Sequence, residues 1–192
     1  MGRKHTVDQE TLIRELRTTF RKFGYEGAAL SELERATGLK KASLYHRFPG
    51  GKDEMAREVL RVTEAQLRES FEQAVPAAAP IAEQVAGLKG FLGAYYSQGQ
   101  TACLLNTLTY PHGGEALFAD EVRSLLQVLL DLVAQIPLRG DSSPEDAAAR
   151  ARQAVMLLEG GLVVSQAMGS AEPFKEALEL AGGLLGAPAH KS

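Results

Sequence analysis

The sequence predicts an all-α protein with a small N-terminal head and a larger helical body. Apolar residues recur at three- and four-residue steps along most of the 192 residues, and alternating β-branched runs are almost absent. Charge is segregated, because residues 1–52 hold eleven Lys and Arg against six Asp and Glu, a net charge of +5, whereas residues 53–192 carry −8. We therefore predict two domains, 1–52 and 53–192, of which the first is suited to a polyanionic partner.

The first 38 residues predict two helices. Thr6 to Gln9 fit a capping box, and the apolar spacing that follows predicts a helix to about Phe23, where Gly24 ends it. The second helix has two possible starts, one at Ser31 through a second capping box and one two residues earlier. It runs to Thr37 and is ended by Gly38, since glycine adopts the left-handed conformation at little cost.

A third, short helix follows from about Lys41 to Phe48 and is stopped by the turn at 49–51. Apolar side chains can pack between this helix, the second and the first, namely Leu33, Ala36, Leu39, Leu44 and Phe48. Cationic and hydrogen-bonding side chains are left facing outward, namely Lys40, Lys41, Ser43, Tyr45, His46 and Arg47. Two short helices around a glycine, the second of them basic, are typical of a DNA-binding helix-turn-helix.

The remaining sequence predicts a helical body. A long helix begins at the acidic pair Asp53-Glu54 and runs to about Ala74, and a Pro- and Ala-rich linker follows at 76–80. Further segments are predicted as helices at 81–98, 115–135, 145–168 and 173–185, with a short apolar segment at 102–108 and a loop from Pro137 to Pro144.

Several function classes are disfavoured by the composition. A single cysteine, Cys103, allows no internal disulfide, and the four histidines lie far apart in the sequence, so neither a metal nor another cofactor is expected. Cys103 and His112 form no convincing nucleophile pair, because no third group orients them, and Cys103 is expected to be a small buried hydrophobe. No apolar run approaches the roughly 18 residues needed to cross a bilayer, so a cytoplasmic protein without membrane contact is expected.

The stretch from Gly38 to Phe48, GLKKASLYHRF, followed by PGGKDE, resembles the DNA-binding signature of the TetR/AcrR family of transcriptional regulators. The resemblance covers about the first 55 residues, and the rest is similar only in length and helical character. It implies a homodimer of all-α subunits that binds a double-stranded DNA operator. It also implies a repressor that a partly apolar small-molecule effector, bound in the body, releases from DNA.

The resemblance also implies which residues contact DNA. Tyr45 resembles the family's phosphate-contacting tyrosine, and Lys52 matches a phosphate contact at a helix N-terminus. The major groove and its flanking phosphates would be met by Lys40, Lys41, Ala42, Ser43, Tyr45 and His46.

The head departs from the family pattern at three places. Ala28 and Ala29 stand where the family usually has the Ser or Thr that caps the second helix and meets a phosphate, so Ser31 is expected to substitute. Lys40 stands where the third helix usually has a Ser cap. Glu34 replaces a small or apolar residue and is expected to face solvent.

The body offers two further sets of candidate residues. An effector cavity would combine aromatic and polar side chains, and the candidates are Tyr95, Tyr96, Asn106, Tyr110, His112, Phe118, Met156 and Glu159. Small and apolar side chains near the C-terminus predict a two-fold, four-helix dimer contact, with the candidates Leu158, Gly161, Leu162, Phe174, Leu178, Ala181 and Leu185.

Two other function classes remain open. The first is a helical small-molecule binding protein whose head does not read DNA. The second is an enzyme, for which the sequence shows no paired carboxylates, metal cluster or phosphate-binding loop. We therefore expect a non-enzymatic, ligand-responsive DNA-binding regulator.

Overall fold

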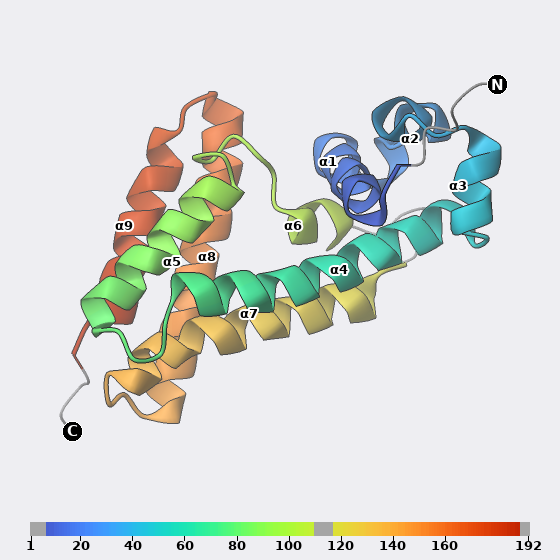
Figure 1. Ribbon diagram of the computed structural model, residues 1–192. Coiled ribbons are helices and arrows are strands. Elements are labelled where there is room, and N and C mark those ends of the chain that lie inside the picture. Colours follow the sequence, from blue (N-terminus) through green and yellow to red (C-terminus); the bar gives the residue numbers. More distant parts are fainter. Residues whose placement is uncertain (1–6, 110–116, 189–192) are drawn as a thin grey trace. The chain divides into compact units, whose positions relative to one another are not determined.

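The computed structural model describes residues 7–109 and 117–188, in which every regular element is a helix (Figure 1). No helix in these ranges is long and apolar enough to cross a membrane. In chain order the helices are α1 (Gln9–Gly27), α2 (Leu30–Thr37), α3 (Lys41–Arg47), α4 (Gly51–Ala74), α5 (Ile81–Tyr95), α6 (Leu104–Thr109), α7 (Ala119–Arg139), α8 (Pro144–Met168) and α9 (Glu172–Gly186).

These helices belong to two compact units. Of the described residues, the first unit contains 7–63, 104–109 and 117–122, and the second contains 64–103 and 123–188. The first unit is larger than the predicted head, because it also includes the first part of α4 and the short helix α6, which packs against α1. A functional division at residue 52 stays a prediction.

In the first unit, α1 is capped by Asp8, whose carboxylate accepts a hydrogen bond from the Thr11 backbone N–H at 2.8 Å. This bond lowers the pKa of Asp8. Asp8 thus takes the capping role that the sequence assigned to Thr6, which lies outside the described residues. Gly24 has φ +65° and kinks the helix where its end was predicted. The extra turn to Gly27 buries Tyr25.

The helix α2 begins at the earlier of its two predicted starts. Its N-cap is Ala29, which has no side-chain acceptor, and Ser31 lies exposed in the first turn. The capping box predicted at Ser31 is therefore not the start of this helix. Gly38 ends α2 with φ +68°, as predicted.

Tyr25 of α1 holds this helix against α4. The Tyr25 hydroxyl donates to the Asp53 carboxylate, and its ring meets the Phe118 ring edge-on with centroids 5.0 Å apart. Burial, together with the Asp53 hydrogen bond, raises the pKa of Tyr25. Arg57 of α4 pairs with Glu121 and donates to the Leu117 carbonyl at 3.1 Å, which holds the start of α7 against α4.

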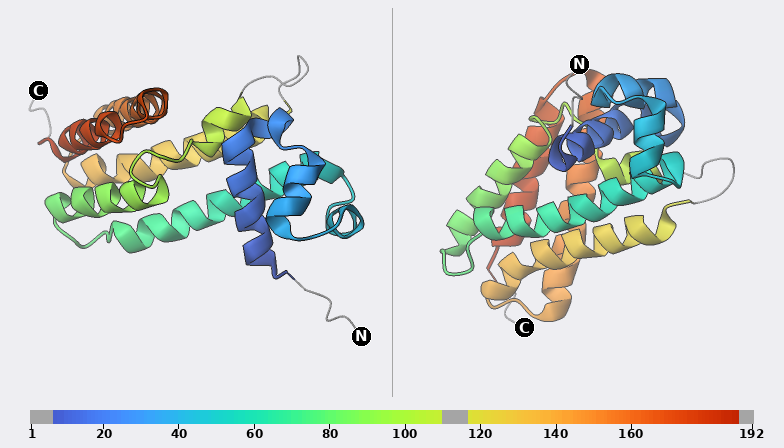
Figure 2. Two further views of the ribbon diagram at one scale, coloured as in Figure 1. Left: turned by 90° about the horizontal axis from the view of Figure 1, so that it is seen from above. Right: turned by 45° about the vertical axis from the view of Figure 1, so that its right-hand side comes forward.

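The core of the second unit is the antiparallel pair α8 and α9, which lie side by side in both views of Figure 2. Helix α8 begins with Ser143 as its N-cap and ends at Gly169 in the left-handed conformation. At Gly161 the two helices approach so closely that a Cβ would lie 2.5 Å from the Ala177 Cβ. Helix α5 packs against α9 in the same unit.

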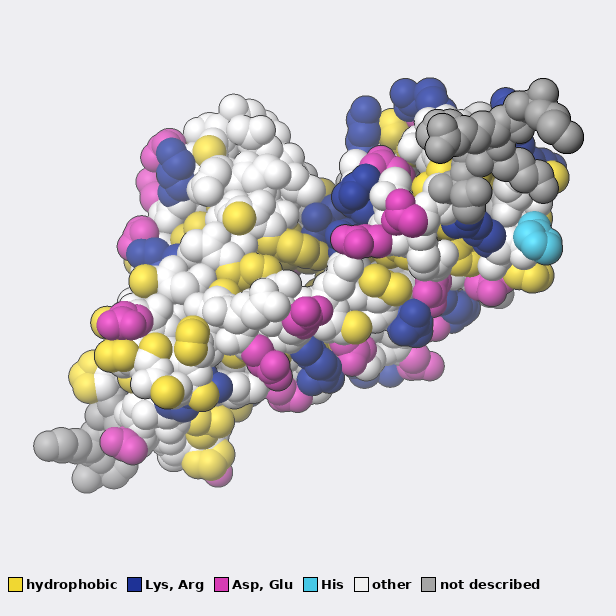
Figure 3. Space-filling view, in the orientation of Figure 1, with side chains coloured by type: hydrophobic (Ala, Val, Ile, Leu, Met, Phe, Trp, Pro, Cys, Tyr) yellow, Lys and Arg dark blue, Asp and Glu magenta, His cyan; other side chains and the backbone are white. Residues whose placement is uncertain are grey.

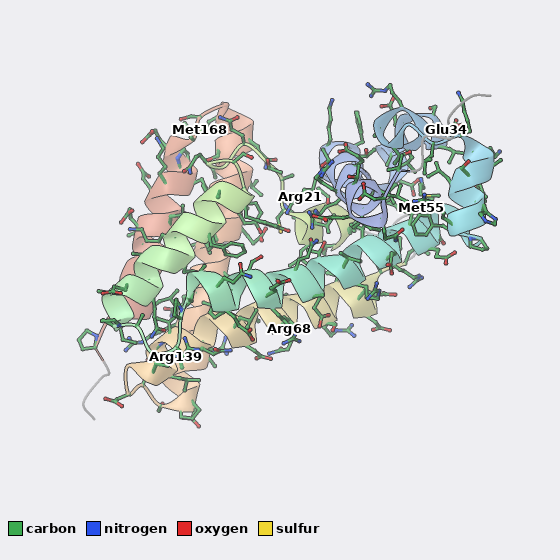
Figure 4. The ribbon with its side chains drawn as sticks, viewed as in Figure 1. Arg21, Glu34, Met55, Arg68, Arg139 and Met168 are labelled. Atoms are coloured by element: carbon green, nitrogen blue, oxygen red, sulfur yellow. The ribbon has the colours of Figure 1, made fainter. Side chains whose placement is uncertain are left out.

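The structure corrects the predicted loop after residue 136. Helix α7 continues through Pro137 to Arg139 (Figure 4). Arg139 donates to the Gln84 side chain at 2.9 Å and to the Gln135 side chain at 2.6 Å. Gln84 is buried and donates to the Ala79 carbonyl at 2.7 Å. These bonds hold the last turn of α7 against the linker before α5, which stabilises the helix beyond its proline.

Candidate nucleic-acid interface

Helix α3 separates its side chains into an inner apolar set and an outer polar set. Leu44 is fully buried and Phe48 is 4% exposed, so the inner face is packed in the core of the first unit. The residues predicted to contact DNA on this helix and at its cap are all exposed, namely Lys40, Lys41, Ala42, Ser43, Tyr45 and His46. The geometry brings six of the eight predicted residues onto one surface, which we call the α3 face.

Tyr45 is the largest side chain of the α3 face and is 42% exposed. The Lys41 ammonium lies 5.8 Å from its ring centroid. On the other side the ring packs against Gly51, where a Cβ would lie 3.3 Å from Tyr45 Cε1. These neighbours leave a large part of the ring accessible, whereas the other side of α3 is covered.

Both ends of α3 are held by hydrogen bonds to residues outside the helix. At its start, the Glu34 carboxylate of α2 accepts a hydrogen bond from the Lys41 backbone N–H at 2.6 Å. At its end, Arg47 donates to the Val7 carbonyl at 2.7 Å. Glu34, which was expected to face solvent, is half-buried, and its carboxylate is also bonded to the start of α3 (Figure 4).

Lys52 and Ser31 lie apart from the α3 face. The Lys52 ammonium donates to the Tyr25 carbonyl at 2.9 Å and sits 4.1 Å from the Tyr25 ring centroid. One of its three N–H groups is thus used within the first unit, and the others remain available to an anion. The phosphate contacts assigned to Lys52 and Ser31 stay predictions.

The space-filling view shows many Lys and Arg side chains over α1 to α3 with some Asp and Glu among them, and along α4 both signs of charge are interspersed (Figure 3). The mixed charges on α4 include the ion pair of Arg61 with Glu58 at 2.7 Å, which lowers the pKa of Glu58. Cations without such carboxylate partners are best placed to neutralise phosphates.

The second unit contains a buried polar cluster among aromatic rings. The Tyr96 hydroxyl donates to the Cys103 sulfur at 3.5 Å, and Tyr96 meets the rings of Tyr95 and Phe174 edge-on at 4.9 and 5.8 Å. Burial raises the pKa of the Glu159 carboxyl, and a hydrogen bond with Cys103 partly opposes this shift. Burial and the neighbouring Cys103 and Glu159 also raise the pKa of Tyr96.

Only three of the predicted effector residues, Tyr95, Tyr96 and Glu159, belong to this cluster. Asn106 and Phe118 lie in the first unit, where Phe118 is fully buried against Tyr25. Met156 is 65% exposed on α8. Tyr110 and His112 lie outside the described residues. The structure adds Cys103, which was expected to pack as a simple hydrophobe and instead joins the hydrogen-bonded cluster.

The residues predicted to form the dimer contact lie in the interior of the single chain and not on its surface. All seven are buried within one chain, where α8 and α9 pack on each other, namely Leu158, Gly161, Leu162, Phe174, Leu178, Ala181 and Leu185. These residues form intrachain core, and a dimer contact through α8 and α9 stays a prediction.

The first unit matches a known protein family. The model described as "Bacterial regulatory proteins, tetR family" matches residues 12–59, which include α2, α3 and the whole α3 face. Residues 12–59 thus match the DNA-binding region of the TetR family. The HTH-type transcriptional regulator LmrA of Bacillus subtilis (strain 168) is 30% identical to this chain over 84 residues, or 44% of the chain. The match spans only 43% of LmrA.

Solved structures resemble this chain in fold over nearly its whole length. A TetR transcriptional regulator from Legionella pneumophila superposes with a TM-score of 0.78 at 15% identity, over 93% of this chain and 97% of its own. A cysteine-substituted TetR family transcriptional regulator CifR, complexed with a 26-base-pair double-stranded operator, gives 0.74 at 24% identity, over 94% and 98%. The likeness in fold therefore includes the second unit, which the family model does not reach.

Proposed function

We propose that this protein is a TetR-family transcriptional repressor that reads a two-fold DNA operator as a homodimer and is released by a small molecule. The α3 face carries the proposal, because it exposes two lysines, a tyrosine and a histidine on a helix whose other side is buried. A seven-residue helix of this kind can enter the major groove, which admits one α-helix. CifR, which has the same fold, was solved on its operator.

A homodimer is supported by an exposed apolar face on α8 and α9. Met156 is 65% exposed, Val163 49% and Leu180 60%, although all three are apolar. Gly160 and Gly183 lie on the same faces, and a Cβ at either glycine would meet nothing within 4 Å. Exposed apolar side chains beside small residues are suited to close packing against a second copy of these helices.

The effector is proposed to contact the polar cluster of the second unit. Tyr95, Tyr96 and Glu159 combine aromatic surface with hydrogen-bonding groups, as small-molecule sites commonly do. Burial raises the pKa of the Glu159 carboxyl and so favours its neutral form, in which the carboxyl can donate a hydrogen bond to a neutral ligand.

Changing Lys41 to Ala tests the DNA-reading role. If each head loses one charge-assisted phosphate contact, operator affinity should fall on the order of 100-fold for a dimer. The slope of log affinity against log salt should become shallower by about 1.8, or 0.9 for each lost contact. Affinity would be measured by fluorescence anisotropy on an operator selected from random duplexes.

Lys175→Ala is the matched control, because it removes the same charge from an exposed position on α9. Equal affinities and salt slopes for the two variants would contradict the reading role of the α3 face. A wild-type protein that binds small molecules but prefers no duplex over random DNA would favour the alternative, a ligand-binding protein without sequence-specific DNA binding.

Changing Glu159 to Gln should alter the pH dependence of stability. The pKa of Glu159 is raised in the folded chain, so above its ordinary value of 4.5 the unfolded chain releases the proton first and folding stability falls as pH rises. The glutamine variant carries no such proton. The melting temperature of the glutamine variant, relative to that of wild type, should therefore increase as the pH is raised above 4.5.

Thermal unfolding followed by circular dichroism would measure this difference. Glu176→Gln on the exposed side of α9 controls for the loss of one negative charge. A difference between Glu159→Gln and wild type that stays constant with pH would show that Glu159 ionises as readily in the folded as in the unfolded chain.

A further inference from the structure

We propose that Glu34 is a positioning residue for DNA reading, because its carboxylate caps helix α3 from the preceding helix α2. This inference rests on the proposed function of the α3 face. The N-cap residue of α3, Lys40, makes no side-chain capping bond. The Glu34 carboxylate, six residues earlier in the chain, instead accepts the Lys41 backbone N–H at 2.6 Å.

The cap is needed because α3 has only seven residues. Its first turn is closed by the Lys40 carbonyl, which accepts from the Ser43 and Leu44 backbone N–H groups at 2.8 and 3.0 Å. The Lys41 N–H precedes these bonds and has no intrahelical acceptor. A carboxylate at this end of a helix also interacts favourably with the helix dipole. Glu34 therefore allows a lysine to occupy the cap position, where its charge can meet a phosphate.

The same bond fixes α3 relative to α2. Between the two helices, Thr37 is 4% exposed, and its hydroxyl donates to the Leu33 carbonyl at 2.7 Å and accepts from the Leu39 N–H at 3.3 Å. These two bonds order the end of α2 and the turn. The Glu34 bond then joins a side chain of α2 directly to the backbone of α3, so it sets the direction in which the α3 face points.

The cap also has an electrostatic cost. Glu34 places a negative charge next to Lys40 and Lys41, where DNA phosphates would approach. Removing only the charge should strengthen binding to any duplex, whereas removing the cap should weaken binding to the operator in particular. Glutamine separates the two effects, because its amide oxygen can accept the Lys41 N–H without a charge.

The test compares Glu34→Ala, Glu34→Gln and Glu32→Ala in the full-length protein. Glu32 is the matched control, since it lies on the same helix and its carboxylate pairs with Arg35 instead of with α3. The measured quantity is the ratio of operator affinity to non-specific duplex affinity at one salt concentration. We expect Glu34→Ala to lower this ratio about fivefold per head, or on the order of 30-fold for a dimer. Glu34→Gln and Glu32→Ala should change it less than about threefold.

Amide hydrogen exchange of α3 without DNA provides the second readout. The Lys41 N–H should exchange faster in Glu34→Ala than in Glu32→Ala, and Glu34→Gln should restore most of the protection. Equal exchange, or an equal affinity ratio, in the Glu34→Ala and Glu32→Ala variants would overturn the proposal. A wild-type protein with no preferred duplex would instead refute the proposed function, and the exchange experiment would still decide whether Glu34 caps α3.

Discussion

Gly160→Arg is expected to convert the proposed dimer into a monomer that has lost most of its operator affinity. In one chain a Cβ at residue 160 would meet nothing within 4 Å, and Gly160 is exposed on α8. Arginine is also a better helix former than glycine, so the subunit itself should fold. A partner helix packed against this glycine would collide with the new side chain and would bury its charge.

A monomer has only one DNA-binding head, so it loses the additional affinity that a dimer gains by binding two operator half-sites at once. The operator affinity should then fall on the order of 1,000-fold, since linked heads act at an effective concentration in the millimolar range. Analytical ultracentrifugation should show a mass near the 20.6 kDa of one chain. Gly90→Arg on α5 is the matched control, because Gly90 is also exposed with nothing within 4 Å. A Gly160→Arg protein that stays dimeric would place the subunit contact elsewhere.

Arg150→Ala is expected to cause a large loss of folding stability. Arg150 is 5% exposed and donates to the Ala187 carbonyl at 2.6 Å and to the Pro188 carbonyl at 3.0 Å. It also pairs with Asp146 at 2.8 Å. The truncation would leave the carbonyls at the end of α9 without this donor and Asp146 without this cation. A cost of about 3 kcal/mol follows, at the low end of the range for breaking a buried ion pair on one side, because the Asp146 side chain is 28% exposed.

That cost should lower the melting temperature by on the order of 10 °C in a chain of this size. Arg152→Ala, two residues further along α8 and exposed, should change the melting temperature by less than about 2 °C. Arg150→Lys should lie between the two, since lysine keeps the charge but lacks the planar fork. Equal melting temperatures for the Arg150 and Arg152 variants would show that the bonds to the end of α9 contribute little.

The helices and the α3 face could be predicted from the sequence because the signals are local. The spacing of Leu44 and Phe48 assigns the inner side of α3, and Gly38 marks the turn before it. The Glu34 cap could not be predicted, because the reach of that carboxylate depends on the angle between α2 and α3. The available signal in the sequence was that Glu34 is an acidic residue six positions before Lys40, a residue type that caps helices poorly.

The burial of the predicted dimer residues within the chain could not be predicted for a related reason. Helix α8 has apolar or small residues on two sides, and periodicity cannot decide which side faces α9. Gly160 and Gly161 illustrate this, since the first faces open space and the second lies against Ala177. The contact of Phe118 with Tyr25 could not be predicted either, because the two residues are distant in the sequence.

The chain has a single thiol, at Cys103, and only 3% of that residue is accessible. A maleimide reagent should therefore label the native protein slowly, at a rate that reports how often this part of the chain opens. The same reaction gives a direct assay for compounds that bind beside Tyr96, since a bound compound would slow the labelling without any engineered probe. The rate at which the native Cys103 is labelled would thus report whether a compound is bound beside it.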